Sequence, residues 1–194
     1  MFYRLKNENT ELLDWADYKY SNDCLETDII TQSDLTKHPN KVIIQDGELV
    51  LNPDWDEIEL NNAKQAKYYE ALEKAKYFID NEAVYQFDEN NSIEATDGNI
   101  GKMTAYAMAF QTGTVDVVYW TSKEDNVLEL HAQDILNILL GLGEIQSNVW
   151  NVQFVNYKNA IEQAQTVEEV EAIIIDYTIP TAEEISEVEE SEEK

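Results

Sequence analysis

The chain has 194 residues, 43% of them hydrophobic, with 4 Trp, 11 Tyr and 5 Phe, and a formal net charge of -27 at pH 7. This apolar and aromatic content excludes a chain that is disordered throughout, because it is sufficient for a hydrophobic core. The acidity argues against direct binding to a nucleic-acid backbone; its simplest interpretation is solubility, with a basic protein partner or mimicry of nucleic-acid charge as alternatives.

Residues 1–52 are predicted to form a small β-rich module of antiparallel strands. The clearest signal is Asp46-Gly47, which stands between two β-branched and aliphatic runs at 41–45 and 48–51. An Asp-Gly pair in this setting is typical of a type I′ hairpin, because both turn residues need a positive φ. The module has the size of an attachment or docking domain.

Residues 53–82 are predicted to form a connector helix. Pro53 suits the first turn of a helix, and the acidic residues that follow it complement the positive helix terminus. The apolar positions form one stripe, made of Ile58, Ala63, Ala66, Tyr69, Leu72, Ala75, Phe78 and Ile79. Lysines and glutamates share the opposite face, which we interpret as a solvated surface rather than a binding patch.

Residues 83–180 are predicted to form an α+β domain, in which helices cover one face of a small antiparallel sheet. The pattern predicts, in chain order, a hairpin with strands at 84–87 and 92–95, a helix from Thr96 or Asp97 to Gly113, and a hairpin with strands at 115–120 and 127–130. Trp120 ends the first strand of this second hairpin and is expected to be buried against a long helix.

That helix is predicted over about residues 132–165, a length of roughly 50 Å. Its first apolar stripe contains Leu139, Leu142, Ile145, Val149 and Val152, and its second contains Trp150, Phe154, Tyr157 and Ile161. Gly141 and Gly143 each weaken a helix by about 1 kcal/mol, which leaves a bend or break open. One small sheet can cover one stripe, so the other is predicted to face the N-terminal module, a second copy or a tail partner.

The sequence after the long helix begins a new element. Thr166 and Glu169 have the spacing of a capping box, which predicts a short helix to about Ile173 before the run Ile173-Ile174-Ile175-Asp176-Tyr177. Residues 181–194 contain seven Glu and one Lys, and we expect them to form a disordered acidic tail.

Residues able to carry catalysis or bind metals are few. His38 and His131 have no metal-ligand spacing, and Cys24 is alone, so it cannot form an intramolecular disulfide and fits a buried apolar role. The stretch from Asp88 resembles part of a calcium loop, but Ile93 stands where that loop needs Gly. We therefore expect no catalytic residues, no metal, no cofactor, no small-molecule substrate and no enzymatic activity.

Targeting signals are equally scarce. The N-terminus lacks the apolar region of a secretory signal, and the longest apolar stretch, 135–142, is interrupted by Asn137 and too short to cross a bilayer. These features predict a soluble protein of the cytoplasm with no membrane partner.

The second half also contains an ordered set of turn, cap and core residues: Trp120, Asp125, Asn126, Leu130, Ile161, Ala164, Thr166, Glu169, Val170, Ile175, Asp176, Tyr177 and Pro180. Over roughly residues 95–180, this order resembles the phage-associated domain of unknown function 4376. Departures are the final aromatic, here Tyr177, and a long helix rich in Ile, Leu, Asn and Gln in place of Ala.

The resembled family is encoded mostly among phage tail and tail-fibre genes and in prophages. The resemblance implies a non-enzymatic tail-associated structural or fibre-assembly protein, present in the bacterial host cytoplasm during assembly or in the virion. Its partners would be tail or fibre components, or a second copy of the chain. Five residues are candidates for interaction or packing: Trp120, Trp150, Phe154, Tyr157 and Ile161. The alternative, based on charge, is an acidic inhibitor or decoy that binds a basic, nucleic-acid-binding host protein.

Overall fold

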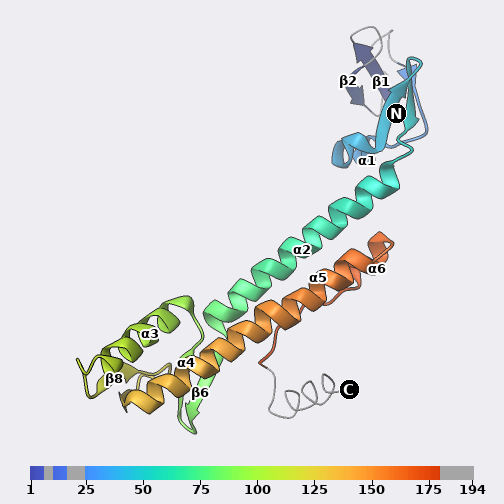
Figure 1. The fold of residues 1–194 in the computed structure, drawn as a ribbon. Helices are drawn as coiled ribbons and strands as arrows, with labels where there is room; N and C mark the ends of the chain where they lie inside the picture. Colours follow the sequence, from blue (N-terminus) through green and yellow to red (C-terminus); the bar gives the residue numbers. More distant parts are fainter. Residues whose placement is uncertain (7–10, 17–24, 180–194) are drawn as a thin grey trace, which may run out of the picture. The chain divides into compact units, whose positions relative to one another are not determined.

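The computed structural model describes residues 1–6, 11–16 and 25–179 and has an α+β architecture, as the sequence predicts (Figure 1). The chain divides into two compact units, Met1–Ala63 and Lys64–Lys194. The division falls inside helix α2, which runs from Trp55 to Asn81. Each unit has its own cluster of buried side chains.

The first unit contains a three-stranded antiparallel sheet, a short helix and a hairpin. Its elements are β1 (Phe2–Lys6), β2 (Glu11–Ala16), β3 (Leu25–Glu26), α1 (Gln32–Lys37), η1 (Pro39–Lys41), β4 (Val42–Gln45) and β5 (Glu48–Leu51). The strand order in the sheet is β2-β1-β3, while β4 and β5 pair separately. The predicted hairpin is confirmed: Asp46 and Gly47 have φ values of 54° and 81°.

Helix α1 was not expected, because the sequence suggested only strands and turns before residue 52. It begins after Thr31, whose hydroxyl oxygen accepts a hydrogen bond from the Asp34 amide at 3.1 Å. The small core of this unit joins helix, sheet and hairpin through Tyr3, Ile30, Leu35, Val42 and Leu49. The Tyr3 hydroxyl also accepts a hydrogen bond from the Leu49 amide at 3.1 Å, which ties the sheet to the hairpin.

The second unit combines the remainder of α2 with two hairpins and a set of helices. Its elements are β6 (Val84–Asp88), β7 (Asn91–Glu94), α3 (Asp97–Gln111), β8 (Val118–Thr121), β9 (Val127–Leu130), α4 (Ala132–Ser147), η2 (Asn148–Gln153), α5 (Phe154–Gln163) and α6 (Val167–Glu171). Both predicted hairpins and the α3 helix are present. Gly113 has a φ of 68° just after α3, as expected for the residue that closes a helix.

The expected small sheet is absent from the described part of the second unit. The hairpins β6–β7 and β8–β9 are instead separate two-stranded ladders. They meet through a turn, because the Lys123 amide in the β8–β9 turn donates to the Ser92 carbonyl of β7 at 3.0 Å. The two hairpins are also joined by the helices, because residues of both belong to the same hydrophobic core. The second hairpin begins at Val118 and not at residue 115 as predicted.

The long helix is present over 32 residues, and it continues through both glycines. At Gly141 the helix touches the Tyr85 ring so closely that an added Cβ would lie 2.1 Å from Tyr85 Cδ2. The irregularity lies further on, in the π-helical segment η2. A π turn takes up more residues than an α turn, so it rotates the residues that follow and accounts for the change of apolar stripe.

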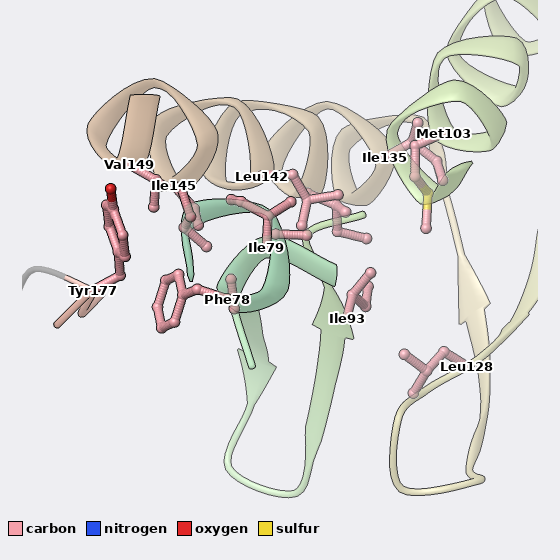
Figure 2. Close-up of a cluster of buried hydrophobic side chains, with 14 of the residues drawn as sticks. Phe78, Ile79, Ile93, Met103, Leu128, Ile135, Leu142, Ile145, Val149 and Tyr177 are labelled. Carbon is pink, nitrogen blue, oxygen red and sulfur yellow. The ribbon is translucent and has the colours of Figure 1, made fainter. Parts of the chain in front are cut away.

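The core of the second unit lies between α2, the long helix and the two hairpins (Figure 2). Leu142, Ile145 and Val149 of the long helix face Phe78 and Ile79 of α2. Ala71 and Ala75 of α2 are also fully buried, which permits close helix packing, so this half of α2 belongs to the core. The compact units thus differ from the predicted division into a connector at 53–82 and a domain at 83–180.

Candidate functional site

Trp120, which was expected to be largely buried against the long helix, is partly buried and packs against the core of the second unit. Its ring contacts the edge of Tyr106 on α3, with centroids 6.4 Å apart. Lys102 Nζ lies 5.5 Å from the centre of the Trp120 ring, a cation–π contact at the surface of the unit. Trp120 therefore packs against α3, because β8 carries it to the rim of the core.

The other four candidates lie on the second stripe of the long helix and are covered within the chain. The Phe154 ring stands between the rings of Trp150 and Tyr68, at centroid distances of 5.7 and 5.5 Å. Ile161 is 3% exposed. This cover differs from the N-terminal module, second copy or tail partner that the sequence suggested: part of it is α2, to which Tyr68 belongs. Val152 was predicted to belong to the first apolar stripe, but its side chain is 44% exposed.

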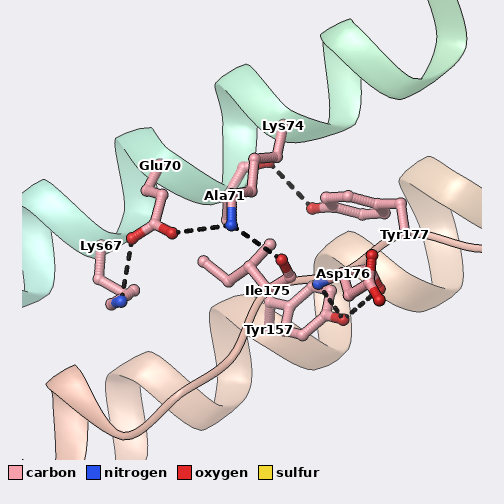
Figure 3. Close-up of polar contacts among 8 residues, drawn as sticks. All are labelled: Lys67, Glu70, Ala71, Lys74, Tyr157, Ile175, Asp176 and Tyr177. Carbon is pink, nitrogen blue, oxygen red and sulfur yellow. Dashed lines mark hydrogen bonds and ion pairs between the residues drawn. The ribbon is translucent and has the colours of Figure 1, made fainter.

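The rest of that surface is an extended segment, residues 173–179, which we call the arm (Figure 3). Its side chains alternate as in a β-strand: Ile175 and Tyr177 are 3% and 5% exposed, whereas Ile174 is 84% exposed. The Tyr177 ring packs against the edge of Tyr157, with centroids 5.3 Å apart, and against Phe78 of α2 at 6.3 Å. The arm thus fills a groove between α2 and the long helix.

Side chains of the long helix bind the backbone of the arm at alternate residues. The Tyr157 hydroxyl donates to the Asp176 carbonyl at 2.6 Å and accepts from the Asp176 amide at 3.0 Å. The Gln153 amide group does the same for Thr178, donating to its carbonyl at 2.6 Å and accepting from its amide at 3.1 Å. Two side chains therefore take the place of a neighbouring strand, and the contacts are to backbone atoms.

The α2 side of the groove contributes two further hydrogen bonds. The Tyr177 hydroxyl donates to the Ala71 carbonyl at 3.0 Å, and Lys74 Nζ donates to the Ile175 carbonyl at 3.0 Å (Figure 3). Burial raises the pKa of Tyr177, so its phenol keeps the proton that it donates. Lys67 and Lys74 both contact the Glu70 carboxylate, and their hydrogen bonds lower the pKa of Glu70. Glu70 therefore holds Lys74 in the position from which it donates to the arm.

Sequence reasoning identified Tyr157 but missed Gln153 and Lys74. Alternation at Ile173, Ile175 and Tyr177 was available as a signal for an extended segment with one buried face. Nothing in the pattern distinguishes Gln153 from the other glutamines of the long helix, because its position depends on the π-helical turn. The groove holds the extended backbone of the arm, with an apolar residue, Ile175, and an aromatic residue, Tyr177, buried two positions apart.

A second polar arrangement joins the turns of the two hairpins in the second unit. The Glu124 carboxylate accepts hydrogen bonds from the Ser92 hydroxyl at 2.5 Å and from the Ser92 amide at 2.8 Å. These bonds lower the pKa of Glu124 to about 2. Asn91, 9% exposed, accepts from the Asn126 amide group at 2.9 Å and donates to both oxygens of Asp88. We interpret this network as a structural junction, since its buried groups are paired with one another.

The remaining candidates have structural partners or lie outside the described residues. The His38 ring packs edge-on against Trp55 at 5.3 Å, and His131 precedes α4, where its backbone amide donates to the Asp134 carboxylate at 2.9 Å. The stretch from Asp88 that resembles part of a calcium loop is a turn in which Asp88 accepts a hydrogen bond from the Asn90 amide. Among the described residues, no group of three or more His, Cys, Asp or Glu side chains is placed to hold a metal ion. Cys24, the tail at 181–194 and Pro180 are not described.

No protein-family model, curated protein or solved structure matches this chain. Within the ranges that the structure describes, every helix is too short or too polar to cross a bilayer. The resemblance to the phage-associated family therefore remains a prediction.

Proposed function

We propose that the chain is a non-enzymatic phage or prophage protein associated with the tail, acting either as a small structural component or in fibre assembly. The observation that carries the proposal is the order of turn, cap and core residues from Trp120 to Pro180, which resembles the domain of unknown function 4376. The proposal applies to the second unit, and its partners would be tail or fibre proteins in the host cytoplasm or the virion.

The structural roles of the described residues in that order support the proposal. Leu130, Val170 and Ile175 are buried, Thr166 caps α6 and Asp125 has the positive φ of a turn. Residues of this kind specify a fold, so a shared order is what two chains with the same architecture would have in common.

The test is to delete the gene from the phage or prophage that encodes it and to analyse purified virions. Mass spectrometry measures the copy number of the chain in the parent virion, and electron microscopy records tails and fibres in the deletion. Presence at structural copy number with altered tails supports a virion component, and absence with altered fibres supports an assembly role. Virions that lack the chain and have normal tails and fibres after the deletion contradict the proposal.

The charge of -27 favours a second candidate, an acidic inhibitor or decoy for a basic host protein. Several described lysines on α2 and α5 are paired with glutamates, as in Lys67–Glu70 and Lys158–Glu162, so they do not offset the excess of carboxylates that gives the chain its charge. Capture of one nucleic-acid-binding host protein that is released by added salt would support this function. Retention of that protein at high salt would argue against recognition by charge.

A further inference from the structure

The turn between α5 and α6 is made of residues that also fit a helix. From Phe154 to Ile179 the sequence contains neither Gly nor Pro, and the turn itself is Ala164-Gln165-Thr166. Ala164 departs from helical geometry through a ψ of 136°, and Thr166 is extended, with φ and ψ of -132° and 161°. Ala and Gln are good helix formers and Thr166 is a helix cap, so this sequence is compatible both with the turn and with continuation of α5.

Two hydrogen bonds hold this turn. The Thr166 hydroxyl accepts from the Glu169 amide at 3.2 Å, and the Glu169 carboxylate accepts from the Gln165 amide at 2.6 Å. The acid thus reaches Gln165 and not Thr166, one residue earlier than the predicted capping box. Both bonds would be replaced by helical backbone bonds if α5 and α6 became one helix, so opening the turn leaves few polar groups without partners.

Beyond the turn, the contacts of the arm do not depend on which copy of the chain supplies it. Its partners Ala71, Lys74, Gln153 and Tyr157 lie 19 to 106 residues away in the sequence. The groove cannot remain empty at low cost, because Ile175 and Tyr177 belong to the hydrophobic core of the second unit. Each groove must therefore be filled, either by its own arm or by that of another copy.

We propose that two copies of this chain exchange arms about this turn. In the exchanged pair, α5 continues through residues 164–166 into α6, and the arm, residues 173–179, of each copy occupies the groove of the other. Exchange of an identical element creates a symmetric dimer that repeats the contacts of the monomer, which makes it a low-cost route to association. The partner is a second copy of the chain, and the interface is independent of the proposed role in phage tails.

Val167 offers a substitution that blocks the exchange without disturbing the closed form. It is the first residue of α6, a position at which Pro is favoured, and the extended Thr166 before it has the conformation that a following Pro requires. In a merged helix the same Pro would remove a hydrogen bond and clash with the carbonyl of Gln163. Thr166→Ala acts in the opposite direction, because it removes the hydroxyl that caps α6.

The experiment compares the full chain with its Thr166→Ala, Val167→Pro and Val167→Ala variants, each refolded at high protein concentration and measured by light scattering. We expect a dimer fraction in the full chain, more of it in Thr166→Ala, and monomer in Val167→Pro, with Val167→Ala close to the full chain. Because each copy is strongly acidic, added salt should increase the dimer fraction.

Two results would overturn the exchange. One is a dimer fraction in Val167→Pro equal to that in Val167→Ala, which would place the interface elsewhere. The other is a monomer for both the full chain and Thr166→Ala at every concentration and salt. Should Val167→Pro lack a cooperative thermal transition, the comparison of Thr166→Ala with the full chain decides: more dimer supports exchange and an equal fraction rejects it.

Discussion

Gly141 and Gly143 are two residues apart on α4 but meet different surroundings. A Cβ at Gly141 would collide with the Tyr85 ring, whereas a Cβ at Gly143 has no neighbour within 4 Å. We expect Gly141→Ala to destabilise the chain by about 1–3 kcal/mol through overpacking. Gly143→Ala should stabilise it by about 0.5–1 kcal/mol, because Ala loses less backbone entropy in a helix. Urea unfolding of the pair measures both, and equal effects would contradict the close contact with Tyr85.

Glu124 should make stability depend on acid pH. Its pKa is lowered from 4.5 to about 2 in the folded chain, so its stabilising effect is complete above the unfolded value and is lost as the pH falls towards 2. Glu124→Gln should therefore lower the melting temperature most near neutral pH, with a difference from the parent that shrinks on acidification. Glu89→Gln, which removes an exposed carboxylate from the β6–β7 turn, is the control. A difference that stays constant down to pH of about 2 would contradict this role for Glu124.

Among the elements, the arm depends on two side chains of the long helix. Tyr157→Phe keeps the ring against Tyr177 but removes both hydrogen bonds to Asp176. With about 0.5–1.5 kcal/mol for each bond, we expect a loss of about 1–3 kcal/mol and faster amide hydrogen exchange at Asp176 and Thr178. Tyr119→Phe is the matched control, because Tyr119 is 63% exposed on β8. Unchanged exchange in Tyr157→Phe would mean that the two hydrogen bonds of Tyr157 do not hold the arm in place.

Elements with strong local signals were predictable from the sequence. Asp46-Gly47 specified the β4–β5 turn, Thr96 and Gly113 marked α3, and apolar periodicity gave the long helix. Helix α1 was missed, because six residues with one buried side chain, Leu35, do not establish a period. The π-helical segment was not predicted, because its residues Asn148–Gln153 contain neither Gly nor Pro to mark a departure from regular helix.

At the scale of the whole molecule, the second unit requires its half of α2. Ala71, Ala75, Phe78 and Ile79 belong to its core, so a fragment of residues 83–179 lacks one wall of the groove and part of the cluster. We expect residues 64–179 to unfold cooperatively on heating and residues 83–179 to show no cooperative transition. Circular dichroism of the two fragments measures this. A cooperative transition in the shorter fragment would mean that α2 is a connector and not a necessary part of the second unit.

The candidate site was predictable only in part, because its two sides come from distant parts of the chain. Phe154, Tyr157 and Ile161 were identified as an apolar face that needs a cover, but the cover is α2 and the arm and not the N-terminal module, a second copy or a tail partner. What covers them depends on contacts between residues far apart in the chain, such as Tyr177 with Ala71, and neither spacing nor composition encodes such a pairing. For Trp120 the sequence indicated burial but not its ring partner, Tyr106 of α3, because that partner too is distant along the chain.

The way in which Gln153 and Tyr157 bind the arm also constrains how the sequence can drift over evolutionary time. Since both contact backbone atoms, positions 174, 176 and 178 are free to change, whereas 175 and 177 must stay apolar and aromatic. Homologous chains should therefore vary at every second residue of the arm, retain a Tyr at 157, and carry Gln at 153 only where the π-helical turn is retained. A homologue that lacks the π-helical turn should also lack Gln153, so this turn and this side chain would be inherited together.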